Sequence, residues 1–337
     1  MNKKIIIMVV PVLVLILIAG YFLATKKESN PSTKTTYRIG IISGLDFFLG
    51  NETGFMQKMT QLGYRESKDI SYDFQKVNSD PETAKKIIQK FVDDGDDLIF
   101  AFPTNVALQA KQMTQDTRIP VVFDNASIEG TDLIQSINNP GGNITGVRQD
   151  APALAVERYL VMRQLVPAAK KMAIFYLKTL AIVPPQLERL RALAKAAKIQ
   201  IVEIPALNKT DVENYLQAQD KLTKPDFDSI LMVVEPLTTM PDIFQLLAQF
   251  ADQHKMPIGG ATVSSGGYES LYGVAVDNIV SGQQAAPLAD EILKGTQAGS
   301  IPVVTAQTFL TINLRAAKKM GIKVGDDVLS QADQVIK

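Results

Sequence analysis

The chain has 337 residues, of which 46% are hydrophobic and 21% charged, ordinary values for a folded protein long enough to form two lobes. Lysine plus arginine and aspartate plus glutamate each number 35, so the formal net charge is zero and no bulk attraction to nucleic acid is expected. The absence of cysteine excludes disulfides, thiolate metal sites, a cysteine nucleophile and the lipid anchor of bacterial lipoproteins, which is carried on a cysteine.

The N-terminal segment carries the clearest local signal. Lys3 and Lys4 precede the uncharged residues 5–24, and an apolar helix of that length spans about 30 Å, enough to cross a bilayer. We predict an uncleaved transmembrane anchor at 1–24. A cleaved signal segment is the alternative, although Phe22 suits a cleavage site ending at Ala24 poorly. A linker is predicted at 25–36, and both alternatives place the rest of the chain outside the cytoplasm.

From residue 37 onward, short apolar runs alternate with amphipathic segments, a pattern typical of parallel α/β architecture. In the first half we predict strands at 38–43, 70–74, 98–102, 120–123 and 144–147, and helices at 48–62, from Pro81 and at 105–114. In the second half we predict strands at 172–177, 200–204, 229–234, 257–259, 271–276 and 303–307. The helices expected there are 153–165, 185–197, one begun by Thr210 or Asp211, 240–254, 279–293 and 314–320.

This pattern predicts an α/β fold of two lobes, each an open, mostly parallel sheet flanked by helices. Lobe 1 is expected to comprise 37–147 and about 264–300, and lobe 2 to comprise 148–263 and about 301–337. In open sheets of this kind, ligands bind beyond the carboxyl ends of the strands, where the strand order reverses. We therefore expect a ligand cleft between the lobes.

Polar and aromatic residues follow several of the predicted strands. Ser43, Asp46 and Phe47 follow the first strand. Thr104 and Asn105 follow the third strand and open a helix. The free N–H groups of that helix can hold an anionic ligand group, or the two side chains can simply cap it.

The later strand ends extend this set of candidate ligand-binding residues. Asp124, Asn125 and Ser127 follow the fourth strand, and Tyr176, Glu235 and Thr262 take comparable positions in the second half, with Asp277 after the strand at 271–276. Each residue alone could equally well be structural. Their common placement at the carboxyl ends of strands predicts a shared ligand site.

Enzyme signatures are missing from the sequence. No G-x-G-x-x-G follows the first strand, and neither a P-loop nor a nucleophile-elbow motif occurs. The single histidine, His254, is expected in the last turn of a helix, facing the negative end of its dipole. Without a second histidine or a cysteine a zinc site is not expected, so we predict no catalytic residue, metal or cofactor.

Short motifs spread along the chain are informative together, although no single one is. The strongest is Leu133-Ile134-Gln135-Ser136 followed by Asn139-Pro140-Gly141-Gly142-Asn143-Ile144-Thr145-Gly146; others are Gln61-Leu62-Gly63-Tyr64, Ile119-Pro120-Val121-Val122-Phe123, Tyr272-Gly273-Val274 and Ala332-Asp333-Gln334-Val335-Ile336. On these motifs, residues 37–337 resemble the ABC-transporter substrate-binding family that includes tryptophan- and tyrosine-binding lipoproteins, of the type I periplasmic-binding fold.

The resemblance implies a non-catalytic protein that delivers a small polar or amphipathic solute to a membrane permease and its ATPase by closing its lobes. Three departures fall where the family holds amino acids. This sequence has Ala126-Ser127-Ile128 where the family usually has an Asp-Pro. It has Tyr176-Leu177-Lys178 in place of the family's Tyr-Asn-Pro, and Glu235-Pro236 in place of its Asp-Asn. An amino acid is therefore not the only ligand class expected.

A membrane-anchored ligand sensor for a signalling partner is the alternative function. It would use the same fold on the same N-terminal segment. Permease and ATPase genes beside the coding gene would favour transport, whereas kinase or chemoreceptor genes would favour sensing.

Overall fold

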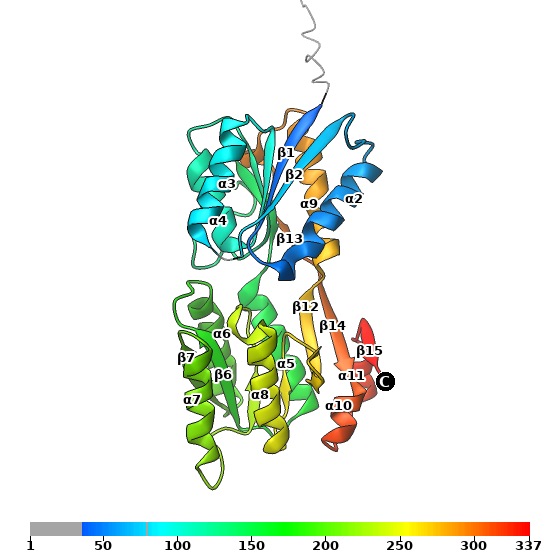
Figure 1. Cartoon of the computed structure of the whole chain (residues 1–337). Helices are drawn as coiled ribbons and strands as arrows, with labels where there is room; N and C mark the ends of the chain where they lie inside the picture. Colours follow the sequence, from blue (N-terminus) through cyan, green and yellow to red (C-terminus); the bar gives the residue numbers. More distant parts are fainter. Residues whose placement is uncertain (1–35, 79) are drawn as a thin grey trace, which may run out of the picture. The chain divides into compact units, whose positions relative to one another are not determined.

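The computed structural model describes residues 36–78 and 80–337, and Tyr37–Lys337 form one compact unit. The elements of this unit fall into two lobes, each built around its own sheet (Figure 1). The predicted anchor at 1–24, and all of the predicted linker except Thr36, lie outside the described residues. Across 36–78 and 80–337, no helix combines the length and apolar character needed to cross a membrane.

Lobe 1 is built on a six-stranded parallel sheet with the order β13-β5-β4-β3-β1-β2. All five residues of β3 are buried, as expected for a central strand covered on both faces. The strands are β1 (Tyr37–Ser43), β2 (Ile70–Lys76), β3 (Leu98–Phe102), β4 (Val121–Ala126), β5 (Ile144–Arg148) and β13 (Val304–Thr305).

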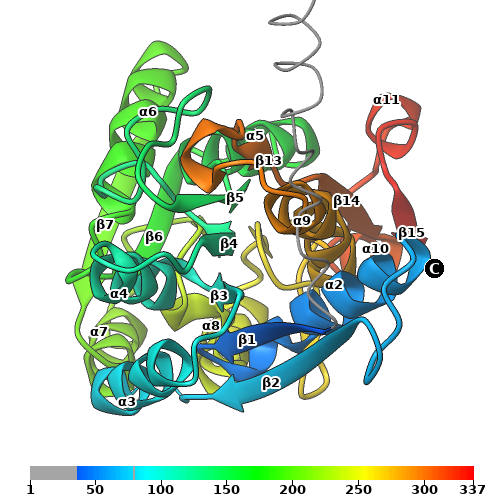
Figure 2. The same ribbon diagram turned by 90° about the horizontal axis from the view of Figure 1, so that it is seen from above.

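Helices cover both faces of this sheet, as Figure 2 shows from above. Ile42 and Ile99 pack with α3 (Pro81–Asp93) and α4 (Thr104–Thr114). Ile41 and Phe100 pack on the opposite face with α2 (Leu49–Gln61) and α9 (Asn278–Leu293). This division follows from the strand period of two, which sends neighbouring side chains to opposite faces.

The helices α2 and α9 pack with their backbones in direct contact. A side chain at Gly54 would collide with the carbonyl oxygen of Ile279, and one at Gly282 would collide with that of Asn51. Glycine is therefore required at both positions, and α9 is held against α2 at the edge where both helices begin.

Lobe 2 contains a parallel sheet of order β7-β6-β8-β9 and a second sheet of order β12-β14-β15. A single bridge between Gly260 and Gly273 joins the two sheets. The strands are β6 (Lys171–Leu177), β7 (Gln200–Ala206), β8 (Ser229–Leu231), β9 (Ile258–Gly259), β12 (Tyr272–Val276), β14 (Thr308–Asn313) and β15 (Gln334–Ile336), with a small hairpin of β10 (Ser264–Ser265) and β11 (Tyr268–Glu269).

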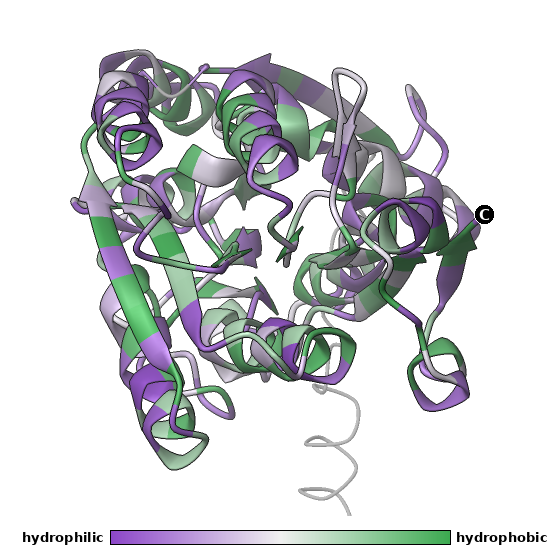
Figure 3. Cartoon of the chain, turned by 90° about the horizontal axis from the view of Figure 1, so that it is seen from below, coloured by the Kyte–Doolittle hydropathy of each residue, from purple (hydrophilic) through white to green (hydrophobic). Residues whose placement is uncertain are grey.

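The helices of lobe 2 also divide between the faces of the parallel sheet. Met172 and Ile174 pack with α5 (Ala151–Leu165) and α6 (Val183–Ala196), and the alternate residues of β6 pack with α7 (Lys209–Asp220) and α8 (Pro241–Gln253). Two short helices, α10 (Leu314–Lys319) and α11 (Asp326–Leu329), follow β14. The helices in Figure 3 carry hydrophilic and hydrophobic residues on different sides, as expected for helices that cover a sheet.

Three connections join the lobes. They run from β5 to α5, from β12 to α9 and from β13 to β14. Arg148, at the end of β5, donates to Thr305 Oγ1 at 3.0 Å and forms ion pairs with Glu129 at 2.5 Å and Asp150 at 2.7 Å. This side chain therefore ties two of the three connections to the loop that follows β4.

The structure moves the predicted lobe boundaries. Residues 264–276, expected in lobe 1, belong with lobe 2 because β12 pairs with β14. Of the strand expected at 303–307 only the two residues of β13 are a strand, and β13 joins lobe 1 through Val304 and Val147; the longer β14, which begins at Thr308, was not predicted. Asn208, rather than Thr210 or Asp211, caps α7 by accepting from the backbone N–H of Asp211 at 3.2 Å.

Candidate functional site

The carboxyl ends of β1, β3 and β4 meet at one edge of the lobe 1 sheet. These three strands are neighbours, and Ser43 at the end of β1 lies in register with Phe102 at the end of β3. The sheet therefore brings together Ser43, Thr104, Asp124 and Asn125, which are between 1 and 82 residues apart in sequence but share this edge.

The end of β4 carries a bulge. Phe123 pairs with Gly146, but Ala126, not Asn125, pairs with Arg148, so β4 contains one extra residue. Asn125 has a φ of 46°, in the left-handed region that asparagine tolerates better than most residues. A bulge redirects side chains, and here both Asp124 and Asn125 are buried.

Asp124 is the centre of a polar group, buried except for the half-buried Asn278, that we call the Asp124 cluster: Asn51, Asp124, Asn125, Asn278 and Ser281. Its carboxylate accepts from Asn51 Nδ2 at 2.6 Å, Ser281 Oγ at 2.5 Å and the Asn125 backbone N–H at 2.7 Å. Burial raises the pKa of Asp124 to about 7, while these three donors act in the opposite direction. The cluster links β4 to the first turns of α2 and α9.

Asn125 and Asn278 extend the cluster toward the loop after β1. Asn125 Nδ2 donates to Asn278 Oδ1 at 2.9 Å and to Asn51 Oδ1 at 3.3 Å. Asn278 Nδ2 donates in turn to the carbonyl oxygen of Phe47 at 2.7 Å. Asn125 Oδ1 is buried and has no hydrogen-bond partner within residues 36–78 and 80–337.

The loop after β1 places an aromatic ring in solvent. Asp46 and Phe47 lie in the short helix η1 (Asp46–Phe48), where Asp46 forms an ion pair with Lys76 at 3.0 Å. The Phe47 side chain is 63% exposed. Ser43 is buried, and its hydroxyl donates to the Leu45 carbonyl at 2.9 Å. Asp46 and Phe47 therefore expose their side chains to solvent, whereas Ser43 does not.

Thr104 and Asn105 do not cap α4, which was the alternative to a ligand-binding role for them. The residue at the N-cap of α4 is Pro103, which makes no side-chain cap. Thr104 is buried in the first turn, and its Oγ1 accepts from the backbone N–H of Ser127 at 3.0 Å. This bond joins the ends of β3 and β4 and leaves the hydroxyl hydrogen available to donate. Asn105 is exposed.

Glu235 in lobe 2 is occupied by its own loops. It is 5% exposed and accepts from the backbone N–H groups of Leu177 at 3.2 Å, Leu237 at 2.8 Å and Thr238 at 2.6 Å, and from the Thr238 hydroxyl at 2.5 Å. Burial raises the pKa of Glu235, while these four hydrogen bonds act in the opposite direction. Glu235 thus holds together the loops that follow β6 and β8.

The remaining predicted residues do not join a common cluster. Tyr176 is half-buried at the end of β6, and the Thr262 carbonyl accepts from Ser270 Oγ at 2.6 Å. Asp277 caps α9 by accepting from the Val280 N–H at 3.0 Å. His254 lies at the end of α8 as predicted, where its Nε2 is 2.7 Å from Asp220 Oδ1.

A strand-end loop of lobe 1 contacts a strand-end loop of lobe 2. A side chain at Gly130, in the loop after β4, would collide with the carbonyl oxygen of Ala181, in the loop after β6. Glu129, next to Gly130, is the residue that pairs with Arg148. The candidate site of lobe 1 therefore lies on the side of the lobe that contacts lobe 2.

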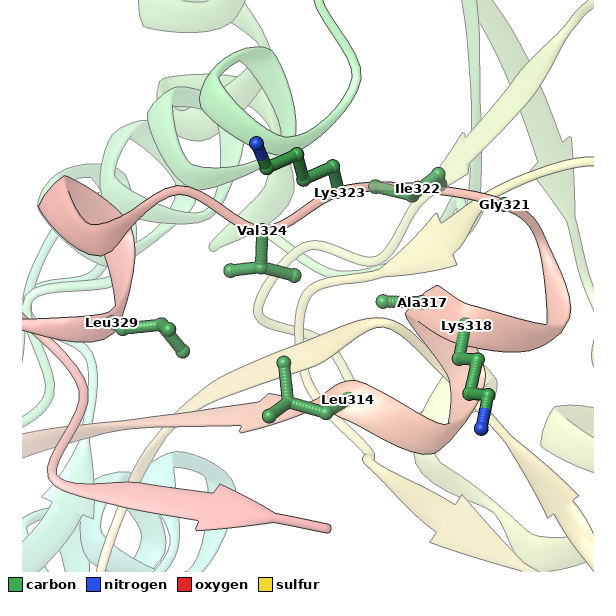
Figure 4. A pocket seen from close by; sticks show the side chains of 8 residues that line it. All are labelled: Leu314, Ala317, Lys318, Gly321, Ile322, Lys323, Val324 and Leu329. Carbon is green, nitrogen blue, oxygen red and sulfur yellow. The ribbon is translucent and has the colours of Figure 1, made fainter.

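Neither a metal site nor the groove beside α10 involves the strand-end residues. The described part of the chain contains no group of three or more His, Asp or Glu side chains arranged to hold a metal ion. A groove of about 500 Å³ lies between α10, the following loop and α11 (Figure 4). It is lined mainly by apolar side chains and the lysines Lys318 and Lys323, and includes none of the strand-end residues.

The sequence prediction missed Asn51, Asn278 and Ser281. Asn51 lies three and four residues before the buried Gly54 and Phe55, so it falls on the buried face of α2. A polar residue on an otherwise buried helical face is the signal that could have identified it. The pairing of Asn278 and Ser281 with β4 has no comparable local signal.

Comparison with known proteins identifies relatives over nearly the whole described unit. The family model described as "ABC transporter substrate binding protein" matches residues 41–336. A "Tyrosine-binding protein" from Clostridioides difficile (strain R20291) is 28% identical over 276 residues, which cover 80% of this chain and 76% of that protein.

Solved structures share the fold. A domain from Streptococcus pneumonia in complex with L-Trp has a TM-score of 0.78 at 21% identity, covering 90% of this chain and 100% of the other. A ligand-free, open substrate-binding protein with adhesive properties from Clostridium difficile has a TM-score of 0.69 at 22% identity, covering 89% and 99%. The predicted α/β fold of the type I periplasmic-binding kind is confirmed.

Proposed function

This chain belongs to the ABC transporter substrate-binding protein family, and from this we propose that it captures a small polar or amphipathic solute between its lobes and presents it to a permease and ATPase. Its place of action is extracytoplasmic, and the family is one of binding proteins rather than enzymes. The observation that carries the proposal is the family match over 41–336, on a chain whose polar strand-end residues converge. Neither the family description nor the relatives' names support the sensor alternative.

The chemistry of the strand ends suggests how a solute is held. The first-turn N–H groups of α4 and the Thr104 hydroxyl are donors, which favours a ligand with an anionic or strongly accepting group. Exposed Phe47 can cover an apolar part of the same solute. Glu235, whose oxygens already accept four bonds, is not needed for the ligand in this arrangement. Relatives named for tyrosine and solved with L-Trp support an amino-acid-like solute as the first class to test.

Ligand binding is expected to make the protein more compact. Two lobes joined by three short connections can rotate about them, and a ligand that contacts both lobes favours the closed state. Small-angle scattering with and without saturating solute should show a smaller radius of gyration in the bound protein. A radius that does not change when calorimetry shows saturation would contradict the closure mechanism.

Replacing Thr104 by valine is expected to weaken solute binding by about 1–3 kcal/mol, or about 5- to 150-fold, if its hydroxyl donates to a desolvated ligand oxygen. The same change leaves the Ser127 N–H without its acceptor, so stability should also fall by about 1–2 kcal/mol. Thr104→Ser is the control, because it keeps the hydroxyl. Calorimetric titration beside thermal unfolding separates the effects, and a valine variant with undiminished affinity would leave Thr104 a purely structural role.

We also propose that residues 5–24 anchor the protein in the membrane without cleavage. The support is the length and lack of charge of this segment in the sequence. The full chain should then fractionate with membranes, while a 33–337 fragment should be soluble and mainly monomeric. N-terminal sequencing of the mature protein decides the question, and a mature start near Thr25 would show that the segment is a cleaved signal.

A further inference from the structure

The amino ends of the strands in the parallel sheet of lobe 2 carry a concentration of positive charge. Four helix-to-strand connections meet at this edge of the sheet: 166–170, 197–199, 221–228 and 254–257. Figure 1 shows the connection after α7 at the lower end of lobe 2. The exposed lysines of these connections and of the first residue of β6, which we call the lobe 2 lysine patch, are Lys170, Lys171, Lys198, Lys221, Lys224 and Lys255.

Backbone hydrogen bonds hold these connections side by side. The Gln200 N–H donates to the Lys170 carbonyl at 2.8 Å, and the Asp228 N–H donates to the Lys171 carbonyl at 2.9 Å. The strand β8 pairs in turn with β9, which follows the fourth connection. Because paired strands lie about 4.8 Å apart, the six lysines form one surface.

The lysines of the patch keep their charge uncompensated. None of the six ammonium groups pairs with a carboxylate among residues 36–78 and 80–337. The carboxylates of the same end have other partners. Asp220 Oδ1 lies 2.7 Å from His254 Nε2, and Asp226 is 3.5 Å from the Gln219 amide. Asp228 accepts from two backbone N–H groups. The patch is therefore positive, although the chain as a whole has a net charge of zero.

Helix ends alone do not account for this charge. A lysine beside the last turn of a helix is favoured by the helix dipole, which explains Lys198 after α6 and Lys221 after α7. The corresponding connections of lobe 1, at 62–69, 94–97 and 115–120, follow helices in the same way but hold twice as many carboxylates as cations. The excess of lysine is thus particular to lobe 2, and it points to an anionic partner there.

The residue types of the patch favour a lipid surface over a protein. Protein interfaces are enriched in arginine and aromatic residues and depleted in lysine, whereas all six cations here are lysines. Leu222, between two lysines of the patch, is 44% exposed. Its connection is fixed at the base by the buried Phe227 and by the Asp226 N–H, which donates to Gln219 Oε1 at 2.8 Å. An aliphatic side chain flanked by cations suits the boundary between lipid headgroups and acyl chains.

We propose that the lobe 2 lysine patch binds the phosphate headgroups of an anionic phospholipid surface, with Leu222 entering the boundary of the acyl chains. This contact goes beyond the proposed function, because it orients lobe 2 on a membrane and takes no part in holding the solute. Each lysine close to such a surface strengthens binding about fivefold, and added salt screens the attraction.

The test places a fluorescent probe in the patch of the full chain. Thr223→Cys supplies a single thiol for labelling at an exposed position, because the natural sequence has no cysteine. The labelled protein is reconstituted into vesicles of phosphatidylcholine, alone or with an equal amount of phosphatidylglycerol, that contain a spin-labelled lipid as quencher. Quenching should be strong with phosphatidylglycerol, weak without it, and lost at high salt.

Two matched double variants assign the contact to the patch. Lys221→Glu with Lys224→Glu should lower the ratio of docked to free protein about 25-fold or more, because two attractions are lost. Lys85→Glu with Lys86→Glu makes the same change of charge at exposed lysines of α3 and should leave the ratio unchanged. Leu222→Ser should weaken quenching while keeping its salt dependence. All these side chains are exposed, and thermal unfolding checks that the variants remain folded.

Equal quenching in the two kinds of vesicle, or equal losses in the two double variants, would overturn the inference. Poly-L-glutamate tests the competing occupant, an acidic protein. If this polymer shifts the emission of the probe while phosphatidylglycerol does not, the patch binds an acidic protein and the inference is wrong. The proposed function is judged separately, by scattering with and without solute. A protein that closes on its solute but ignores phosphatidylglycerol retains that function and loses only this inference.

Discussion

Replacing Arg158 by alanine is expected to lower the free energy of unfolding by about 3–5 kcal/mol. Arg158 is 3% exposed, and its guanidinium donates to the Val274 carbonyl at 2.9 Å and the Met232 carbonyl at 3.3 Å. These carbonyls lie on β12 and just past the end of β8, where the two sheets of lobe 2 share a single bridge. The side chain therefore adds a buried link between two sheets whose backbones are joined by hydrogen bonds between residues 258–260 and 271–274.

The expected loss of stability follows from the two backbone carbonyls that Arg158→Ala leaves without a donor. Each buried carbonyl that loses its donor costs about 1–3 kcal/mol, and the deleted side chain leaves a cavity in addition. Burial lowers the pKa of Arg158 to about 10, so the guanidinium remains charged at neutral pH and its bonds are charge-assisted. The loss should be similar across neutral pH.

Arg163→Ala in the same helix is the matched control. Arg163 also bonds to backbone carbonyls, those of Pro167 at 3.0 Å and Ala169 at 3.4 Å, but it lies near the surface. Its replacement should cost less than about 1 kcal/mol. Urea unfolding of both variants measures the difference, and equal losses would show that Arg158 does not connect the sheets.

The stability of the protein is expected to fall with rising pH because of Asp124, and Asp124→Asn should remove that dependence. The pKa of Asp124 is raised from 3.8 to about 7 in the folded protein. Below pH 4 the carboxyl is protonated in both the folded and the unfolded state, and Asp124 makes its full contribution to stability. Between pH 4 and 7 the unfolded chain releases the proton first, so folding becomes less favourable as pH rises.

The magnitude is set by the difference between the two pKa values. Each unit corresponds to 1.36 kcal/mol, so the stability of the natural protein relative to Asp124→Asn should fall by about 2–4 kcal/mol from pH 4 to 7 and then level off. Urea unfolding of both proteins at several pH values gives this difference. Asp96, whose pKa burial raises to about 6, titrates in the same window but contributes equally to both proteins. A difference that stays constant with pH would show that Asp124 is not shifted.

Local signals in the sequence predicted the elements well where one signal dominates. The run at 98–102 matches β3 because a short run of five apolar residues is typical of a strand buried on both faces. Pro81 begins α3 as predicted, with Asp80 accepting from the first-turn N–H groups. The cap of α7 was missed because Asn208, Thr210 and Asp211 can all cap a helix, and the backbone geometry selects among them.

The candidate site shows the limit of sequence reasoning more clearly. The strand-end rule placed Ser43, Thr104, Asp124 and Asn125 at one edge, as the structure does. It could not show that the oxygens of Glu235 already accept hydrogen bonds from backbone N–H groups of the surrounding residues. Asp124 meets Asn51 and Ser281 across 73 and 157 residues of sequence, and only the packing of α2 against α9 brings those partners together.

The pairing of β12 with β14 has a mechanical consequence for lobe closure. These strands are hydrogen-bonded from Tyr272–Ile312 to Val276–Thr308, so two of the three connections leave lobe 2 as one antiparallel ribbon. Such a ribbon flexes across its flat face without breaking its ladder, but sliding one strand past the other breaks several bonds at once. We therefore expect the proposed closure to follow a single axis, across the flat face of this ribbon. Each closure of the proposed kind would then end in the same geometry, so that the proposed permease would meet one reproducible surface whichever molecule carries the solute.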